Sequence, residues 1–449
     1  MSPGAVAGRQ GVHEGDHTNS RAFRRLLVNT LVTAITSSFV WFALTFWVYV
    51  ESHSVVATGV IGGSFSITSA ILGPIVGTYV DHHRKHRAMV LTSVLSVAGL
   101  SAATVVYAAF GPAEVVRLGH AGFWLLVATT LFGSVAGQLR SVPLSTCVTL
   151  LVPEAERDKA NGRVGTITGI AFAITSVFSG LVIGRLGMGW AYAIGLVVTI
   201  VALGDLLTIR FGEPEPTPLE PGAKRSHVDV AGALESIRAV PGLGLLVFLA
   251  AVNNLLGGVF MALLDAYGLS LVSVETWGAL WFLISLAMIA GGLVVATKGL
   301  GRDPLRLIIL ANLANWFVCV LFPVRSSIVL LTVGMVVWLG LLPVIEAAEQ
   351  TVLQKAIPFE RQGRVFGFSQ LVENAAAPLT AFLMAPLAER VFMPTMSAGG
   401  RGADLIGRWY GVGPERGLAL MFTLAGAAGV VITLAARWSG AYRRLASTA

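Results

Sequence analysis

The chain has 449 residues, of which 55% are hydrophobic and only 12% are charged. Soluble domains carry about 25% charged residues, so the composition excludes an ordinary soluble protein and predicts a polytopic membrane protein. The formal net charge of +7 does not indicate a nucleic-acid partner, because in a membrane protein the distribution of basic residues matters more than their total.

The predicted elements begin with residues 1–23, which carry no apolar core and are expected to form a disordered cytoplasmic tail. Beyond them, apolar runs repeatedly reach the ~20 residues that a helix needs to cross a bilayer. Twelve spans are predicted, at 26–50, 55–80, 88–110, 121–149, 163–184, 189–208, 242–264, 274–296, 304–323, 326–350, 364–388 and 417–437. We therefore expect an all-α membrane protein with twelve transmembrane helices in two six-helix bundles.

The bundles are expected at 24–208 and 242–437, joined by a cytoplasmic linker at 209–241 and followed by a cytoplasmic tail at 438–449. Within the linker, the stretch "VDVAGALESIRAV" predicts a short surface helix. Of the 31 basic residues, seven arginines fall in the loops assigned to the outside and Arg140 falls inside a span, which leaves 23 on the inside. This bias predicts that both termini are cytoplasmic.

Two stretches in the two halves share one layout. "VPEAERDKANGRVGTITGI" (152–170) and "IPFERQGRVFGFSQLVEN" (357–374) both run from a proline through charged residues and Gly-Arg-Val into an apolar segment. The triplets lie 201 residues apart, on either side of the linker. The echo predicts two repeats of like orientation, an architecture typical of transporters that carry substrate between the repeats.

The loop after the second span reads "GTYVDHHRKHR" (77–87) and resembles the signature of the major facilitator superfamily. The stretches "SVPLSTCVTLLVPEAERDKANG" and "QKAIPFERQGRVFG" are similar to the bacterial drug-efflux branch, which includes macrolide exporters and mycobacterial multidrug pumps. The resemblance implies that the loop is a gate whose ion pairs and helix-end contacts break as the halves rock. The alternative is a basic loop that only sets topology. The gating residues implied are Gly77, Asp81, Arg84, Lys85 and Arg87.

Glu373 lies in the eleventh predicted span, nine residues after Arg364. At ~1.5 Å per residue it is about 13 Å along the helix, near the middle of a ~30 Å hydrocarbon core. Desolvation there favours the protonated carboxyl, which suits a group that binds and releases a proton in each cycle. Asn374 beside it favours a wet pocket in the substrate cavity. The alternative is a neutral, hydrogen-bonded structural glutamate.

Arg140 in the fourth span and Glu346 and Glu349 in the tenth are further charged groups at membrane depth, where each charge is a functional hypothesis. Aligning the two repeats puts Arg140 level with Ile345, next to Glu346. We therefore expect Arg140 to line the substrate cavity and pair with Glu346 or Glu349, which join Glu373 as candidate proton-coupling groups. The alternative is that both acids reach the inner headgroup region near Lys355.

Polar and aromatic residues supply further candidates for the substrate cavity. Small polar groups at helical spacing line a cavity or hold helices together, and both alternatives remain open. Trp41 and Trp338 are candidate contacts for a lipophilic substrate, with lipid-facing or packing roles as the alternative. The polar candidates are Asn29, Thr33 and Ser37 in the first span and Asn253 and Asn254 in the seventh.

No phosphate-binding loop and no metal-ligand spacing of Cys or His occurs in the sequence, so no cofactor and no metal are expected. Cys147 and Cys319 lie in apolar segments and predict buried thiols rather than a disulfide. A membrane enzyme is the competing class, but the loop histidines form no recognisable catalytic group.

The sequence therefore predicts a transporter that exports lipophilic or amphipathic small molecules, such as drugs, by proton antiport with alternating access. The alternatives are an exporter of an endogenous metabolite, siderophore or lipid-like molecule, and uptake or uniport. The expected partners are a small-molecule substrate, protons and the lipid bilayer, with no nucleic acid. The chain is expected to be a monomer in the bacterial inner membrane.

Overall fold

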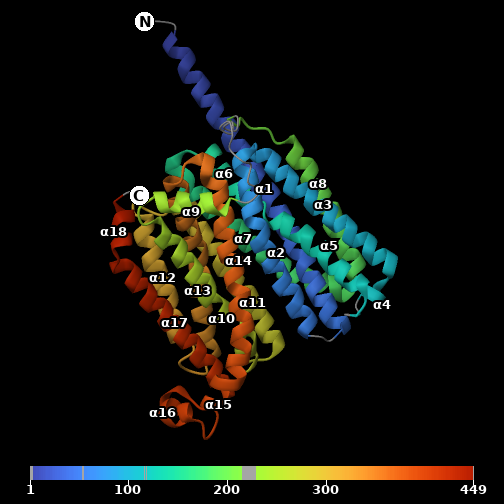
Figure 1. The fold of residues 1–449 in the computed structure, drawn as a ribbon, viewed down its shortest axis with the longest axis vertical. Helices are drawn as coiled ribbons and strands as arrows, with labels where there is room; N and C mark the ends of the chain where they lie inside the picture. The colour runs from blue at the N-terminus through green and yellow to red at the C-terminus, as the bar shows by residue number, and fades with distance from the viewer. Residues whose placement is uncertain (1–3, 53–54, 116, 118, 215–228, 448–449) are drawn as a thin grey trace. The chain divides into compact units, whose positions relative to one another are not determined.

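The computed structural model describes residues 4–52, 55–115, 117, 119–214 and 229–447, and these residues form helices and loops without a strand (Figure 1). The expected all-α fold is confirmed, because the long helices follow the predicted spans in order. They are α1 (Gly4–Ser52), α2 (Val55–His82), α3 (Lys85–Phe110), α5 (Ala121–Gln138) with α6 (Ser141–Leu151), α7 (Arg157–Arg185), α8 (Met188–Thr208), α10 (Leu243–Leu269), α11 (Val274–Lys298), α12 (Pro304–Leu321), α13 (Ile328–Ala356), α14 (Gln362–Leu387) and α17 (Pro414–Trp438).

Among the described residues, 11 helical segments are long and apolar enough to cross a membrane. They account for every predicted span except the eleventh, which corresponds to α14. The short helices are α4 (Pro112–Val115), α9 (Val230–Ala239), α15 (Met393–Met396), α16 (Arg401–Tyr410) and α18 (Gly440–Ala446), with single turns at 154–156, 359–361 and 388–392. The linker helix predicted from "VDVAGALESIRAV" is confirmed as α9.

The first helix differs from the prediction, because α1 begins at Gly4 within the segment expected to be disordered. Residues 1–3 of that segment lie outside the described part of the chain, as do 215–228 of the linker and 448–449 of the C-terminal tail. Helix propagation needs only one new backbone hydrogen bond per residue once a stable turn exists. The membrane span supplies that turn, and good helix formers such as Ala5, Ala7 and Gln10 continue it towards the N-terminus.

The fourth predicted span is interrupted at Leu139 and Arg140, which separate α5 from α6. Pro143 explains the break, because its nitrogen has no hydrogen and its ring clashes with the carbonyl of the residue four positions earlier. That residue is Leu139, whose carbonyl instead accepts from the backbone nitrogen of Val142 at 3.2 Å. The interruption places Arg140 at a junction between two helices.

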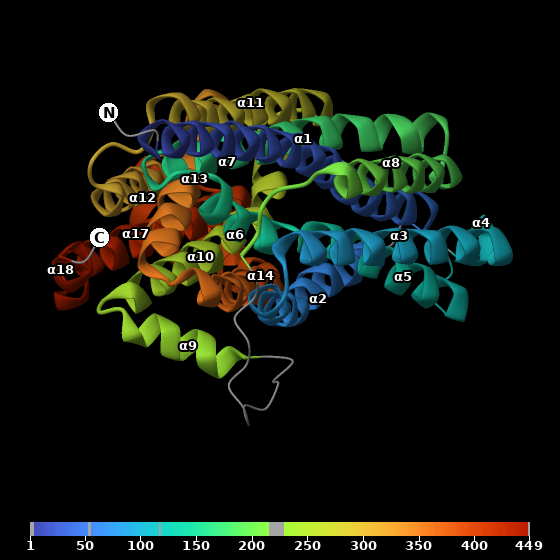
Figure 2. The ribbon, with the colours of Figure 1, turned by 90° about the horizontal axis from the view of Figure 1, so that it is seen from above.

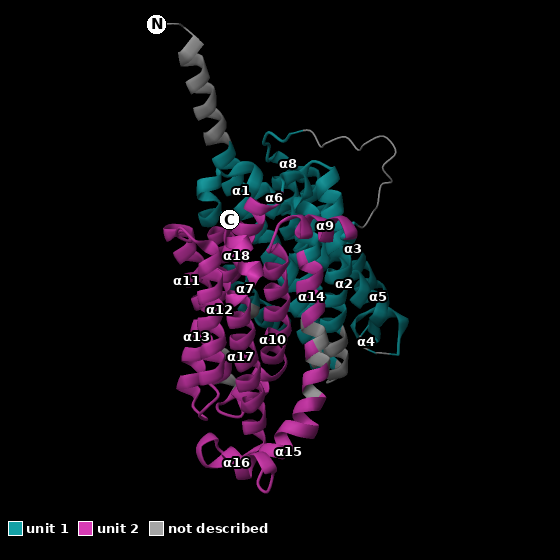
Figure 3. Cartoon of the chain, turned by 60° about the vertical axis from the view of Figure 1, so that its left-hand side comes forward, with its two compact units in different colours: residues 1–160, 170–230, 358–368 teal, residues 161–169, 231–357, 369–449 magenta. Residues whose placement is uncertain are grey.

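The chain divides into two compact units (Figure 3). Unit 1 contains residues 1–160, 170–230 and 358–368, and unit 2 contains 161–169, 231–357 and 369–449. The start of α14 thus belongs to unit 1, whereas its remainder belongs to unit 2. An early part of α7, residues 161–169, belongs to unit 2.

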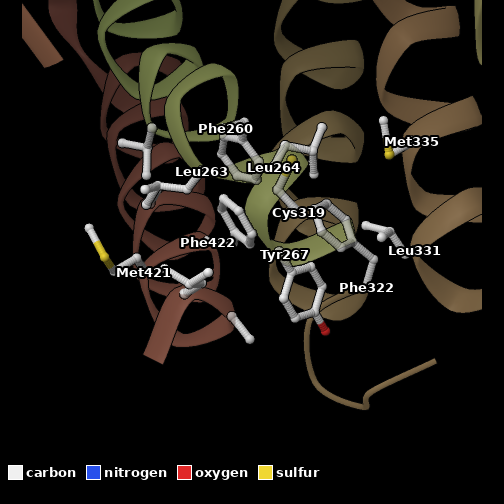
Figure 4. Close-up of a cluster of buried hydrophobic side chains, with 14 of the residues drawn as sticks. Phe260, Leu263, Leu264, Tyr267, Cys319, Phe322, Leu331, Met335, Met421 and Phe422 are labelled. Atoms are coloured by element: carbon white, nitrogen blue, oxygen red, sulfur yellow. The ribbon is translucent and has the colours of Figure 1, made fainter. Parts of the chain in front are cut away.

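Each unit has its own apolar core. In unit 1, α3 packs along α5 and α8, and α1 packs along α8, which Figure 2 shows beside it. In unit 2, α12 packs against α13 and α17, and α10 packs against α17. Figure 4 shows the aromatic centre of the second core, where the rings of Phe260 and Phe422 are stacked with centroids 4.9 Å apart. Offset-stacked aromatic pairs of this kind stabilise a core beyond the area that they bury.

Candidate functional site

Three acidic residues form one cluster in unit 2. Glu346 and Glu349 lie one turn apart on α13, so they share a helix face. Glu373 comes from α14, and Glu349 lies close enough to both other carboxyls for their charges to interact. The structure therefore brings together the three candidate proton-coupling groups. No group of acidic, histidine or cysteine side chains in the described part of the chain has an arrangement that would hold a metal ion.

The cluster is accessible from outside the protein. Glu346 is exposed, whereas Glu349 and Glu373 are half-buried. None of the three carboxyls forms an ion pair with a described Lys, Arg or His. Ionisable groups at membrane depth face a water-accessible or protein-lined space, since lipid contact would be too unfavourable. Three neighbouring negative charges repel one another strongly in such a place, so this arrangement is suited to hold and exchange protons.

Asn374 follows Glu373, but its side chain forms hydrogen bonds within its own helix. Its side-chain nitrogen donates to the backbone carbonyl of Gln370 at 2.9 Å and to the side-chain oxygen of Gln370 at 3.1 Å. The amide is half-buried and lies one turn from the Gln370 side chain. The helix thus presents a short polar stretch beside the carboxyl of Glu373.

The predicted gating residues Gly77 and Asp81 lie on α2 against the start of α14, within unit 1. The Oδ1 atom of Asp81 accepts from the backbone nitrogen of Gly363 at 2.6 Å. Its Oδ2 atom accepts from the backbone nitrogen and Nε of Arg364, at 3.0 and 2.7 Å. The carboxylate therefore caps the N-terminus of α14 from another helix, where an acid is stabilised by the helix dipole.

Close packing makes this cap possible. A Cβ atom on Gly77 would lie 2.3 Å from the carbonyl oxygen of Gly363, so the two backbones meet only because glycine has no side chain. Arg364 also pairs with Asp229, whose backbone nitrogen donates to Thr78 at 3.0 Å. The linker next to α9 is thereby attached to the same contact.

The basic members of the predicted gate have different surroundings. Lys85 is buried, and its Nζ atom donates to the carbonyl of Val80 at 2.7 Å and lies 4.9 Å from the ring centre of Phe359. Arg84 and Arg87 are exposed. Lys85 thus belongs to the packed contact, whereas the two arginines lie at its surface.

The Gly-Arg-Val triplet at 162–164 makes an equivalent approach within unit 2. A Cβ atom on Gly162 would lie 2.4 Å from the backbone nitrogen of Ala296 on α11, the helix that corresponds to α2 in the repeat. Beside it, Asn161 donates to Thr351 and to Gln354, both at 2.9 Å. The repeated sequence therefore corresponds to two close glycine contacts. The contact at Gly363 involves the carboxylate of Asp81, whereas the contact at Gly162 involves neutral side chains.

Arg140 is buried in unit 1, with 1% of its surface exposed. Its Nη1 atom donates to the hydroxyls of Thr33 at 3.0 Å and Ser93 at 3.5 Å, whereas its Nε and Nη2 atoms form no hydrogen bond with a described residue. Glu346 and Glu349 belong to unit 2, so the pairing with Arg140 stays a prediction. A buried guanidinium with free donors is a strong anchor for any negative charge that reaches it.

Asp205 is a polar partner that sequence reasoning missed. It accepts from Arg25 at 2.6 Å and from Asn29 at 2.7 Å, and its charge interacts with Arg140. Asn29 also donates to the carbonyl of Ala202 at 2.8 Å. The sequence does contain a feature that marks this residue, because Asp205 is an acid within the apolar run at 189–208.

The remaining candidates mostly contribute to packing. Asn253 donates to Asn312 at 2.8 Å and accepts from Trp316 at 3.1 Å, which joins α10 to α12. Asn254 donates to a carbonyl of its own helix, and Ser37 is buried. Trp338 lies in the core of unit 2, 4% exposed, with its ring centre 5.2 Å from that of Phe260.

Trp41 lies in an aromatic group of unit 1. Its ring centre is 4.6 Å from that of Phe42 and 4.9 Å from that of Phe65 on α2. The indole nitrogen is buried without a hydrogen-bond partner. An unpaired indole N–H beside apolar rings is suited to a ligand that has an acceptor next to an apolar surface.

Known proteins resemble this chain in sequence and in fold. The sequence model of the Major Facilitator Superfamily matches residues 26–381. The human protein solute carrier family 67 member A1 is 23% identical over 250 residues, which cover 54% of this chain and 56% of that protein. The chain therefore spans about half the length of that relative.

Solved structures share the architecture. The human organic anion transporter MFSD10 (TETRAN) superposes with a TM-score of 0.67 at 13% identity, over 92% of this chain and 99% of that one. A bacterial homologue of the iron transporter ferroportin, in an outward-facing state, superposes with a TM-score of 0.68 at 14% identity, over 93% and 100% of the two chains. At such low identity these similarities show the fold alone.

Proposed function

This chain belongs to the Major Facilitator Superfamily, and on that premise we propose that it exports lipophilic or amphipathic small molecules in exchange for protons. The observation that carries the proposal is the cluster of Glu346, Glu349 and Glu373 in unit 2. An antiporter needs a group that binds a proton from one side of the membrane and releases it to the other. A carboxyl cluster at membrane depth without a cationic partner meets this need.

The position of Glu373 on α14 suggests how proton binding would be coupled to the gate. Glu373 lies ten residues after Gly363, which is about 15 Å along one helix at ~1.5 Å per residue. The same helix therefore carries the carboxyl and the N-terminus that Asp81 caps. Protonation of Glu373 reduces the repulsion within the cluster, so α14 can shift and release the cap.

The contact between Asp81 and α14 would act as the gate of alternating access. Alternating access requires contacts that form in one state and break in the other. The neutral contact around Asn161 would form the second half of the gate. A proton moving inward along the membrane potential yields about 2.3 kcal/mol per 100 mV, enough to drive export against a modest gradient.

The substrate class rests on the resemblance to drug exporters and on the aromatic group around Trp41. We infer that this group contacts lipophilic substrates while Arg140 provides a polar anchor. The expected location is the bacterial inner membrane with both termini cytoplasmic, since the inner loops carry most of the basic residues.

The test uses the purified chain in proteoliposomes with an imposed pH gradient and a fluorescent lipophilic cation. We expect the dye to move against the proton flux, and we expect Glu373→Gln to abolish this movement while the protein stays folded. Glu389→Gln is the matched control, because Glu389 is an exposed acid beyond the end of α14. Undiminished transport by Glu373→Gln would remove Glu373 from the coupling role. A folded wild-type protein that moves no dye would contradict drug export and favour an endogenous metabolite.

A further inference from the structure

A cavity of about 550 Å³ lies in unit 1 between the first residues of the span in α1 and the last turns of α8. The two helices lie side by side in Figure 2. The volume is in the range of sites that bind small ligands. The cavity is lined by Arg21, Arg24, Arg25, Val28, Asn29, Val32, Val201, Ala202 and Asp205.

The charge of this cavity is positive, because three guanidiniums face one carboxylate. Arg25 is held in place, since its Nη2 atom donates to Asp205 at 2.6 Å and to Thr208 at 2.7 Å. Arg21 and Arg24 are exposed, and neither forms an ion pair with a described residue. Two guanidiniums are therefore available for an anion, and a third is positioned beside them by Asp205.

Apart from Asn29, the rest of the lining is apolar, and two of its valines are exposed. Val28 is 63% exposed and Val201 is 64% exposed, which places two uncovered valines next to the arginines. The candidate spans begin at Asn19 in α1 and end at Thr208 in α8, so the arginines lie at the end of the membrane segment and the valines further inside it. This order, charged then apolar, matches a ligand with an anionic head and an acyl chain.

We propose that this cavity binds the headgroup of an anionic phospholipid. Arg21 and Arg24 bind the phosphate through charge-assisted hydrogen bonds, and the acyl chain lies over Val28 and Val201. Basic pockets between transmembrane helices on the cytoplasmic side are suited to such headgroups. A soluble phosphate shares the chemistry of the head, but it has no apolar part to lie over the two valines.

The test measures lipid retained by the full chain in native mass spectrometry after equilibration with equimolar phosphatidylglycerol and phosphatidylcholine. We expect one phosphatidylglycerol to bind preferentially. The double variant Arg21→Gln/Arg24→Gln should bind it about 30-fold more weakly, at about 1 kcal/mol for each arginine near the surface. Arg25 is left in place, because its removal would leave Asp205 without its partner. The matched control, Arg302→Gln/Arg306→Gln, removes two exposed arginines, one before α12 and one in its first turn, and should retain wild-type binding.

Two further measurements distinguish a lipid headgroup from free phosphate as the ligand. Inorganic phosphate alone should bind far more weakly than the lipid, and Val28→Asn should weaken lipid binding while leaving phosphate binding unchanged. Equal losses in the double variant and its control would overturn the proposal, since net charge alone would then explain retention. Binding of inorganic phosphate as tight as that of the lipid would also overturn it. Thermal unfolding of each variant distinguishes these results from misfolding.

Discussion

Replacing Asp81 by Asn keeps the size of the side chain but removes the charge that caps α14. The carboxylate accepts three hydrogen bonds from Gly363 and Arg364 at 2.6–3.0 Å, whereas an amide offers one oxygen and turns an NH₂ group towards the donors of Arg364. Hydrogen bonds to charged groups contribute about 1.5–3 kcal/mol each. Losing two of the three should therefore weaken the contact by about 3 kcal/mol, which shifts its equilibrium about 100-fold.

The assay compares turnover with substrate affinity in proteoliposomes. Turnover should fall between about 10- and 100-fold, because the variant destabilises the one of the two transport states in which Asp81 caps α14. Substrate affinity should change by less than about threefold, because Asp81 is buried and its oxygens already contact α14. Asp229→Asn is the matched control, since Asp229 pairs with Arg364 but is more exposed than Asp81.

The reasoning would be refuted by weaker substrate binding with normal turnover. It would also be refuted if Asp229→Asn lowered turnover as much as Asp81→Asn does. The first result would place Asp81 in the substrate site, and the second would show that any charge beside Arg364 suffices.

Three other substitutions probe packing and polar contacts. Gly162→Ala should lower transport and thermal stability by overpacking, about 1–3 kcal/mol, whereas Gly180→Ala on the same helix points into open space and should be neutral or stabilising. Asn161→Ala should slow turnover equally at low and high salt, because its partners are neutral; a marked salt dependence would contradict this. Arg416→Met should lower the unfolding temperature markedly, since the buried guanidinium donates to the carbonyls of Pro323 and Val324.

The gating contact shows where sequence reasoning reached its limit. Gly77 and Asp81 were predicted from their resemblance to a family signature, but their partner was not. The start of α14 lies 282 residues away in the chain, and no local pattern indicates which helix end a carboxylate will cap. Similarly, Glu349 and Glu373 were predicted separately, and only the tertiary structure brings them close enough for their charges to interact.

For other candidates the sequence left two alternative roles open. Trp338 and Asn253 were candidates for the substrate cavity, because a single helix does not reveal which of its faces meets another helix. In the structure Trp338 packs within an aromatic core, and Asn253 forms a hydrogen bond that links α10 to α12. Asp205 was missed although it is an acid within an apolar run, and its partners Arg25 and Asn29 became evident only in the structure.

The order and approximate bounds of 11 transmembrane helices follow from the sequence alone, because crossing a bilayer is a local requirement of length and hydropathy. The sequence also marks the charged residues within these apolar runs, although the acid Asp205 was overlooked. The tertiary structure decided which of these charges meet, which glycines allow backbones to touch and where an anion can bind. Those properties depend on side chains from helices far apart in the chain, and helix packing in a membrane is directed by shape and polar contacts rather than by hydrophobicity.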